Sequence, residues 1–243
     1  PGTVLPGLLS PMTHAAMPIL RGKTARRLAR VGAALLFGAI ASAPGCNYAA
    51  AAAYVIAGPP KVDARYKLDK TRKTVVFIDD RTNVVPRRSL RYVMGETVES
   101  ELIINAGMPA EMMIPAQSTL RATSSERLGT PMSVIDIGRL VGAEIVIYAV
   151  VKKFALSPDG ISYSPTGEAE VKIFDATNNQ RLFPPSGDGL PVTMLLPMKT
   201  DGLPTGLAEK NAAEEQAARA MGVQIARTFF SYERDALSGN LDD

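Results

Sequence analysis

Histidine and cysteine are almost absent from this chain of 243 residues, which has one of each, His14 and Cys46. A single cysteine excludes an intramolecular disulfide framework. Beyond Cys46 the chain has neither the histidine or cysteine ligands of a zinc site nor a histidine base to activate a serine or cysteine nucleophile. We therefore predict no metal site, no cofactor and no catalytic residue, and we expect that the protein is not an enzyme.

Tryptophan is absent and only 6% of the residues are aromatic, which leaves little surface on which nucleic-acid bases could stack. The formal net charge of +3 does not indicate a nucleic-acid surface either. The first 45 residues contain five basic side chains and no acidic one, and beyond them acidic side chains outnumber basic ones. The excess of positive charge therefore belongs to the amino-terminal segment, and we expect no nucleic-acid partner.

The amino-terminal segment has the pattern of an export signal. Arg26, Arg27 and Arg30 precede an apolar run over residues 31–43. That run is shorter than the roughly 20 apolar residues that cross a bilayer, but it suits a secretory signal peptide. We predict that translation starts at Met17, so that residues 1–16 are not made and residues 17–45 are the signal peptide.

The signal ends at a motif that resembles a bacterial lipobox. The small residues Ala43 and Gly45 precede Cys46, which is the only cysteine in the chain. In such a motif the cysteine becomes the lipid-modified amino terminus after cleavage. The alternative is an ordinary signal peptide beside an accidental cysteine, but a free thiol would be a liability in an exported protein. We predict acyl chains on Cys46 and a protein that faces the periplasm, at the outer rather than the inner membrane.

Four segments follow from composition and pattern. Residues 1–45 are the leader, and residues 46–72, which include an Ala-rich stretch broken by prolines, are the lipidated cysteine and a tether. A packed first helix in place of the tether is the alternative. Residues 73–235 are the globular domain, and residues 236–243 are a polar tail.

The domain opens with a strand over residues 74–78, followed by a long helix from Pro86 whose apolar residues recur every four positions. Residues 111–115 are expected to be a short strand. A short helix should begin at Thr130 and Pro131 as N-cap and first residue, and Gly142 suits its carboxyl end.

The centre of the domain is the stretch 142–183. Residues 145–151 are almost all apolar, as in a strand covered on both faces. Charged residues then alternate with apolar ones, as in a strand with one solvated face; they are Glu168, Glu170 and Lys172. A last helix is predicted over residues 207–234, with Glu214 away from its apolar stripe. The class is α+β, with a mixed sheet of about four to five strands, a long helix after the first strand, a short helix before the central strand and a long carboxyl-terminal helix.

Four features carry a resemblance to a known family. They are residues 75–78 behind a lipobox and tether, residues 140–148, residues 171–175 with a turn at Asn178 and Asn179, and the final Ala-rich helix. The domain resembles the envelope lipoproteins that include the curli-secretion lipoprotein, the lipoprotein activators of penicillin-binding proteins and the TolB amino-terminal domain. The resemblance implies a scaffold for protein partners or for ring assembly, with no catalytic residue to carry over.

Two charged groups allow more than one interpretation. Asp79 and Asp80 follow the first strand, where carboxylates bind a metal or substrate in some folds and shape a turn in others. Lys152 and Lys153, with the arginines of the long helix, form either a basic patch or ordinary solvated faces; these arginines are Arg87, Arg88 and Arg91.

The function predicted from sequence is that of a lipid-anchored periplasmic protein, a non-enzymatic accessory or scaffold that acts by protein–protein contact. Glu168, Glu170 and Lys172 are the predicted partner surface, and the partner is an unidentified envelope protein. The first alternative is a subunit of an oligomeric outer-membrane secretion assembly, which leaves a homo-oligomer open. The remote alternative is a carboxylate-dependent hydrolase.

Overall fold

A computed structural model describes residues 61–124, 132–197 and 202–233. The predicted signal residues and lipid attachment site lie outside these ranges; they are Arg26, Arg27, Arg30, Ala43, Gly45 and Cys46. The described residues belong to one compact unit, Pro59–Asp243. No helix within the described ranges is both long and apolar enough to cross a membrane.

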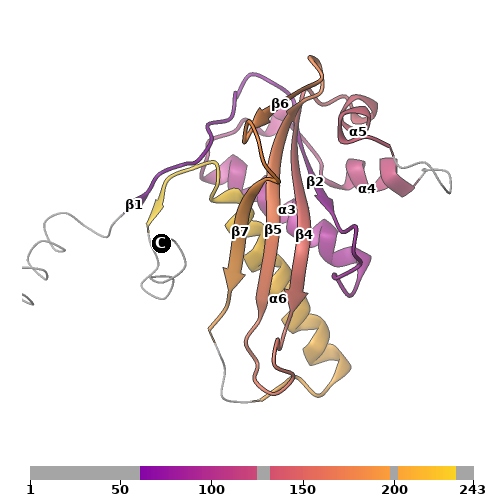
Figure 1. Cartoon of the computed structure of the whole chain (residues 1–243), viewed down its shortest axis with the longest axis vertical. Helices are drawn as coiled ribbons and strands as arrows, with labels where there is room; N and C mark the ends of the chain where they lie inside the picture. Colours follow the sequence, from indigo (N-terminus) through magenta and orange to yellow (C-terminus); the bar gives the residue numbers. More distant parts are fainter. Residues whose placement is uncertain (1–60, 125–131, 198–201, 234–243) are drawn as a thin grey trace, which may run out of the picture. The chain divides into compact units, whose positions relative to one another are not determined.

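The fold is α+β, as predicted (Figure 1). The strands are β1 (Lys61–Val62), β2 (Thr74–Asp79), β3 (Met113–Ile114), β4 (Ile145–Ala155), β5 (Thr166–Asp175), β6 (Gln180–Phe183), β7 (Leu190–Leu195) and β8 (Tyr232–Glu233). The helices are α3 (Arg88–Ile104), the 3-10 turn η1 (Ala110–Met112), α4 (Gln117–Ser124), α5 (Val134–Val141) and α6 (Leu207–Ala226).

The main sheet has six strands and mixed direction. β2 lies between β3 and β4 and is parallel to both, and β5 is antiparallel to β4. The other edge of β5 is shared, because β7 pairs with its first half and β6 with its last residues. Figure 1 shows β4, β5 and β7 side by side, with α6 on one face of the sheet. A separate two-stranded sheet joins β1 to β8.

The central strand β4 is covered on both faces, which confirms the prediction for residues 145–151. Ile147 and Val151 belong to the core beneath α3 and α6, whereas Val146 and Tyr148 belong to a second core beside α4 and α5. Each of these side chains is at most 3% exposed. The continuous apolar run therefore reflects a strand between two helical layers.

The short helix α5 begins later than the sequence predicts. Its N-cap is Ser133, whose hydroxyl oxygen accepts the N–H of Asp136 at 3.1 Å. Thr130 and Pro131, the predicted start, lie outside the described ranges. Gly142 ends the helix with φ of 80°, a left-handed conformation that glycine adopts at little cost. The predicted carboxyl end is therefore confirmed.

The carboxyl-terminal helix ends at Ala226, not near residue 234 as predicted. The carbonyl of Thr228 accepts the N–H groups of Arg65 and Tyr66 at 2.8 and 3.0 Å, and the chain then enters β8. Tertiary pairing here replaces the helical continuation that local sequence favours. The same pairing corrects the assignment of residues 61–72 to a tether, because β1 lies there and Tyr66 packs against the main core.

Glu214 is buried, contrary to its predicted place outside the apolar stripe of α6. It is 3% exposed, and its Oε2 accepts the Nε–H of Arg87 at 2.8 Å. Arg87 also donates to the carbonyl of Asn211 at 3.1 Å. Because α6 packs against both α3 and the sheet, its buried face is wider than a single stripe, and the arginine compensates the buried charge.

Candidate functional site

The three residues of the predicted partner surface lie on one face of the sheet. Glu168, Glu170 and Lys172 alternate along β5 with buried Ala169 and Val171, so they point away from α3 and α6. The structure therefore brings them together as the alternation predicts. We call this surface the open face; its residues are Lys152, Lys153, Glu168, Glu170, Lys172, Pro191, Thr193 and Leu195.

A β-bulge places both lysines of β4 on the open face. The register pairs Val151 with Ala169 and Lys153 with Glu168, so Lys152 is the additional residue. Lys152 Nζ lies 3.1 Å from Glu170 Oε2, and Lys153 Nζ lies 3.4 Å from Glu168 Oε1. Without the bulge, strict alternation along β4 would bury Lys153 and expose Phe154. With the bulge, Lys153 points to the open face and Phe154 is 7% exposed.

These ion pairs contribute little to stability. The lysines retain 47% of their side-chain exposure, and Glu168 retains 53%. Exposed pairs of this kind are worth about 0–1 kcal/mol. Within the described part of the chain Lys172 has no ion pair. The open face therefore carries charged side chains that a partner can engage without disrupting the fold.

β7 is an edge strand of the open face. The N–H of Leu196 donates to the carbonyl of Pro165 at 2.9 Å. Every second residue of β7, counted back from Leu196, therefore directs its backbone N–H and C=O groups toward β5. Residues of the opposite phase, Thr193 and Leu195, point their N–H and C=O groups outward. Pro191 shares this outward phase, so its missing N–H costs no bond to β5. Among the described strands only β5 pairs with β7, which leaves an edge able to accept an added strand.

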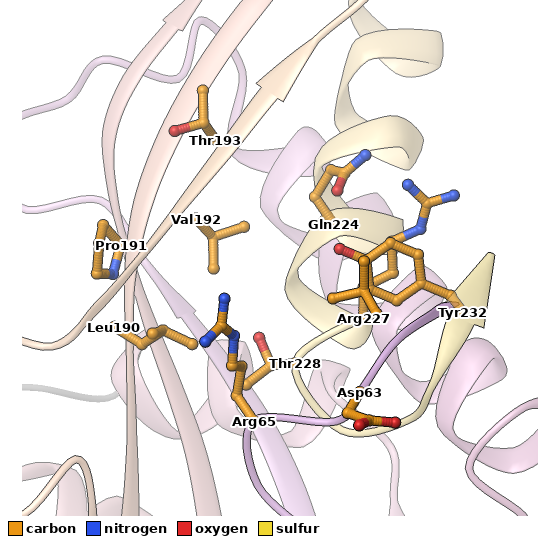
Figure 2. Close-up of a pocket in the computed structure, with 11 residues that line it drawn as sticks. Asp63, Arg65, Leu190, Pro191, Val192, Thr193, Gln224, Arg227, Thr228 and Tyr232 are labelled. Atoms are coloured by element: carbon orange, nitrogen blue, oxygen red, sulfur yellow. The ribbon is translucent and has the colours of Figure 1, made fainter. Parts of the chain in front are cut away.

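A pocket of about 370 Å³ opens beside this edge (Figure 2). Figure 2 shows side chains of β7 on one side of it and side chains of α6 and the β1–β8 region on the other. Two of its three charged side chains are already engaged: Arg227 Cζ lies 4.5 Å from the centroid of the Tyr232 ring, and Asp63 accepts from the hydroxyl of Ser231 at 3.3 Å. The pocket contains no nucleophile beside a base, so we assign it no catalytic chemistry.

Asp79 and Asp80 separate into two roles. Asp80 shapes the turn after β2, since its carboxylate accepts the N–H groups of Val84 and Val85 at 2.9 and 3.0 Å. Asp79 Oδ2 accepts from the Tyr148 hydroxyl at 2.6 Å and from Arg81 Nε at 3.0 Å. Burial, followed by this hydrogen bond, raises the pKa of Tyr148, which keeps the hydroxyl protonated as a donor.

No group of three or more His, Cys, Asp or Glu side chains that could hold a metal ion occurs within the residues that the structure places. The turn interpretation therefore accounts for Asp80, and a contact with Tyr148 and Arg81 accounts for Asp79.

The most connected polar cluster is one that the sequence does not reveal. Asp175 accepts from Arg72 Nη1 at 2.9 Å and from the N–H groups of Thr177 and Asn178 at 2.9 Å each, while Arg72 Nε donates to Glu144 at 3.1 Å. The hydrogen bond from Arg72 is the main cause that holds the pKa of Asp175 below its usual range. The cluster joins the start of β2 to the turn after β5, and it is structural.

The basic residues noted in the sequence do not form one patch. Arg87 pairs with Glu214, and the two lysines pair with Glu168 and Glu170. Arg88 and Arg91 face a separate cleft beside α4 and α5.

No family model matches the chain, and no curated protein matches it. The solved structures that resemble it include the PelC dodecamer from Paraburkholderia phytofirmans, at 13% identity, covering 72% of this chain and 97% of that one with a TM-score of 0.36. Hypothetical protein CT253 from Chlamydia trachomatis has 16% identity, coverage of 65% and 93%, and a TM-score of 0.36. Lipoprotein GNA1162 from Neisseria meningitidis has 11% identity, coverage of 58% and 91%, and a TM-score of 0.35.

Proposed function

We propose that this chain is a lipid-anchored envelope protein that faces the periplasm and acts by binding a protein partner, without catalysis. The observation that carries the proposal is the order of the leader: a basic cluster, a short apolar run, small residues and then Cys46, the only cysteine. Several acyl chains on one cysteine anchor a protein stably, whereas a single chain holds only weakly. The domain beyond residue 60 is then displayed at the membrane surface.

The open face supports the protein-binding part of the proposal. Four of its five charged side chains sit in weak pairs, and the fifth, Lys172, has no ion pair among the described residues. Leu195, which is 49% exposed, adds apolar surface at its border. The adjoining edge of β7 offers backbone donors and acceptors. Mixed charges and an unpaired edge together suit recognition of an extended or sheet-containing protein surface.

The positions of the strand carboxylates also favour binding over hydrolysis. Glu168 and Glu170 pair with lysines, and Asp80 accepts two backbone N–H groups in a turn. A carboxylate pair that acts as acid and base needs two environments that separate its pKa values around a substrate. Glu168, Glu170 and Asp80 have instead the partners of surface ion pairs and of a turn.

Replacing Cys46 by alanine should move the protein from the membrane fraction to the soluble periplasmic fraction, because the anchor is lost while the domain is unchanged. Membrane fractionation with immunodetection measures the shift, and intact-mass analysis of the native protein measures the added acyl mass. Density separation of inner and outer membranes checks the proposed outer-membrane location. A variant that stays with membranes, together with native protein that carries no lipid mass, would contradict the anchor.

A photo-crosslinking residue placed at Lys172 or Thr193 should yield one discrete crosslinked product with an envelope protein in living cells. The matched control is the same residue at Gln216, an exposed position on α6, on the opposite side of the sheet. Mass spectrometry then identifies the product. Equal crosslinking from all three positions would show that the open face is not the binding surface, and a product containing only this chain would favour self-assembly.

A further inference from the structure

A cleft of about 550 Å³ lies beside the carboxyl end of β2, apart from the open face. The end of β2, the loop after it, the first turns of α3 and the helices α4 and α5 contribute its walls. In parallel sheets, ligands bind at the carboxyl ends of strands where the connections leave in opposite directions. β2 meets that condition, because the chain passes through α3 to β3 on one side and returns through α4 and α5 to β4 on the other.

Three arginines and a single carboxylate line the cleft: Arg81, Arg88, Arg91 and Asp79. The negative charge of Asp79 is compensated by Arg81, whose Nε–H donates to Asp79 Oδ2, and the Tyr148 hydroxyl donates to the same oxygen. Arg88 is held by a bond from its Nη2 to the carbonyl of Leu120 at 2.8 Å, which leaves its charge uncompensated. Arg91 is half-buried and has no hydrogen bond or ion pair within residues 61–124, 132–197 and 202–233.

The amino-terminal end of α3 carries positive side chains, where a helix start favours negative ones. The positive end of the helix dipole favours acidic residues, yet the first turn of α3 has none, and no side chain caps it. Arg88 and Arg91, three positions apart, share one face of this helix. Glu214 offsets the charge of Arg87, but Arg88 and Arg91 lack such a carboxylate in the described structure. An anion between them would remove this repulsion, and violations of local rules tend to occur at functional sites.

Apolar side chains complete the lining of the cleft. Met132 and Val134 are half-buried, whereas Phe77 and Ile137 are only 4% and 1% exposed. Guanidinium groups beside partly exposed apolar side chains favour an anionic head attached to an apolar body, because the head makes charge-assisted hydrogen bonds while the body contacts Met132 and Val134.

We propose that this cleft binds a phosphate group carried by an apolar body, with Arg88 and Arg91 holding the phosphate oxygens. This site goes beyond the proposed partner-binding function and does not depend on it. The phosphate can belong to a lipid headgroup or to a soluble phosphate ester, since the chemistry at the arginines is the same.

The test is a titration of the full chain, in a non-ionic detergent, with inorganic phosphate, phenyl phosphate and short-chain phosphatidylglycerol, followed through the NMR signals of the arginine Nε–H groups. Saturable shifts are expected at Arg88 and Arg91, with phenyl phosphate several-fold tighter than inorganic phosphate. Tightest binding by phosphatidylglycerol assigns a lipid headgroup, and tightest binding by phenyl phosphate assigns a soluble ester. Arg91→Gln should weaken binding by about tenfold.

The control is Arg219→Gln, which removes the same charge from an exposed position on α6 outside the cleft. It should change the affinity by no more than about twofold. Both substituted positions are at the surface or half-buried, so circular dichroism should show the native fold in each variant. The absence of saturable shifts at Arg88 and Arg91, or an equal loss of affinity in Arg219→Gln, would overturn the proposal.

Discussion

Replacing Asp175 by alanine is expected to lower the free energy of unfolding by about 3 kcal/mol, because a buried ion pair that loses one partner leaves a desolvated charge. The Asp175 side chain is 3% exposed and that of Arg72 is 23% exposed. The substitution also removes the acceptor of two backbone N–H groups and of the Asn178 amide. Glu144 remains as a partner for Arg72, which limits the loss.

Urea unfolding measures this loss. Asp188→Ala is the matched control, since Asp188 is exposed in the loop before β7, and its replacement should change the free energy of unfolding by less than about 0.5 kcal/mol. Equal effects of the two substitutions would show that the Arg72–Asp175 contact does not stabilise the domain.

The contribution of Asp175 should also depend on pH. Arg72 holds the pKa of Asp175 below its ordinary range, whereas in the unfolded chain the pKa is about 3.9. The stabilisation is therefore complete well above about pH 4 and is lost as the pH falls from there through the lower pKa of the folded state. The difference in unfolding free energy between the native chain and Asp175→Asn should shrink between about pH 7 and about pH 3. A constant difference would contradict this assignment.

Replacing Gly222 by alanine should lower the free energy of unfolding by about 2 kcal/mol. A Cβ atom on Gly222 would lie 2.7 Å from the carbonyl oxygen of Met94 and 2.7 Å from Thr97 Cβ, where α6 crosses α3. Alanine is the better helix former by about 1 kcal/mol, so propensity alone predicts stabilisation. The backbone oxygen cannot rotate away, however, and the two helices would have to separate, so overpacking is expected to exceed the gain in propensity.

Thermal and urea unfolding distinguish the two effects by sign. Gln216→Ala, at an exposed site of the same helix, tests helix propensity without the close approach and should be neutral or slightly stabilising. A Gly222→Ala variant more stable than the native chain would mean that α3 and α6 do not approach as closely as described.

Features that depend on neighbouring residues could be predicted from the sequence. The apolar run of β4 identified a strand between two layers, and the fourfold spacing from Leu90 to Leu102 identified the buried side of α3. Gly142 marked the end of α5, and alternation placed Glu168, Glu170 and Lys172 on one face. Periodicity and backbone preference are local properties, so a contiguous segment is enough to predict them.

Contacts between distant groups could not be predicted from the sequence and became visible only in the folded structure. Arg72 and Asp175 are 103 residues apart, and no pattern in either segment indicates the other. The direction of Lys153 depends on a bulge defined by pairing with β5. The end of α6 depends on Thr228, whose carbonyl accepts from Arg65 and Tyr66 in the segment before β2. Charges and backbone groups choose partners by distance and burial, which the chain acquires only when its strands and helices pack.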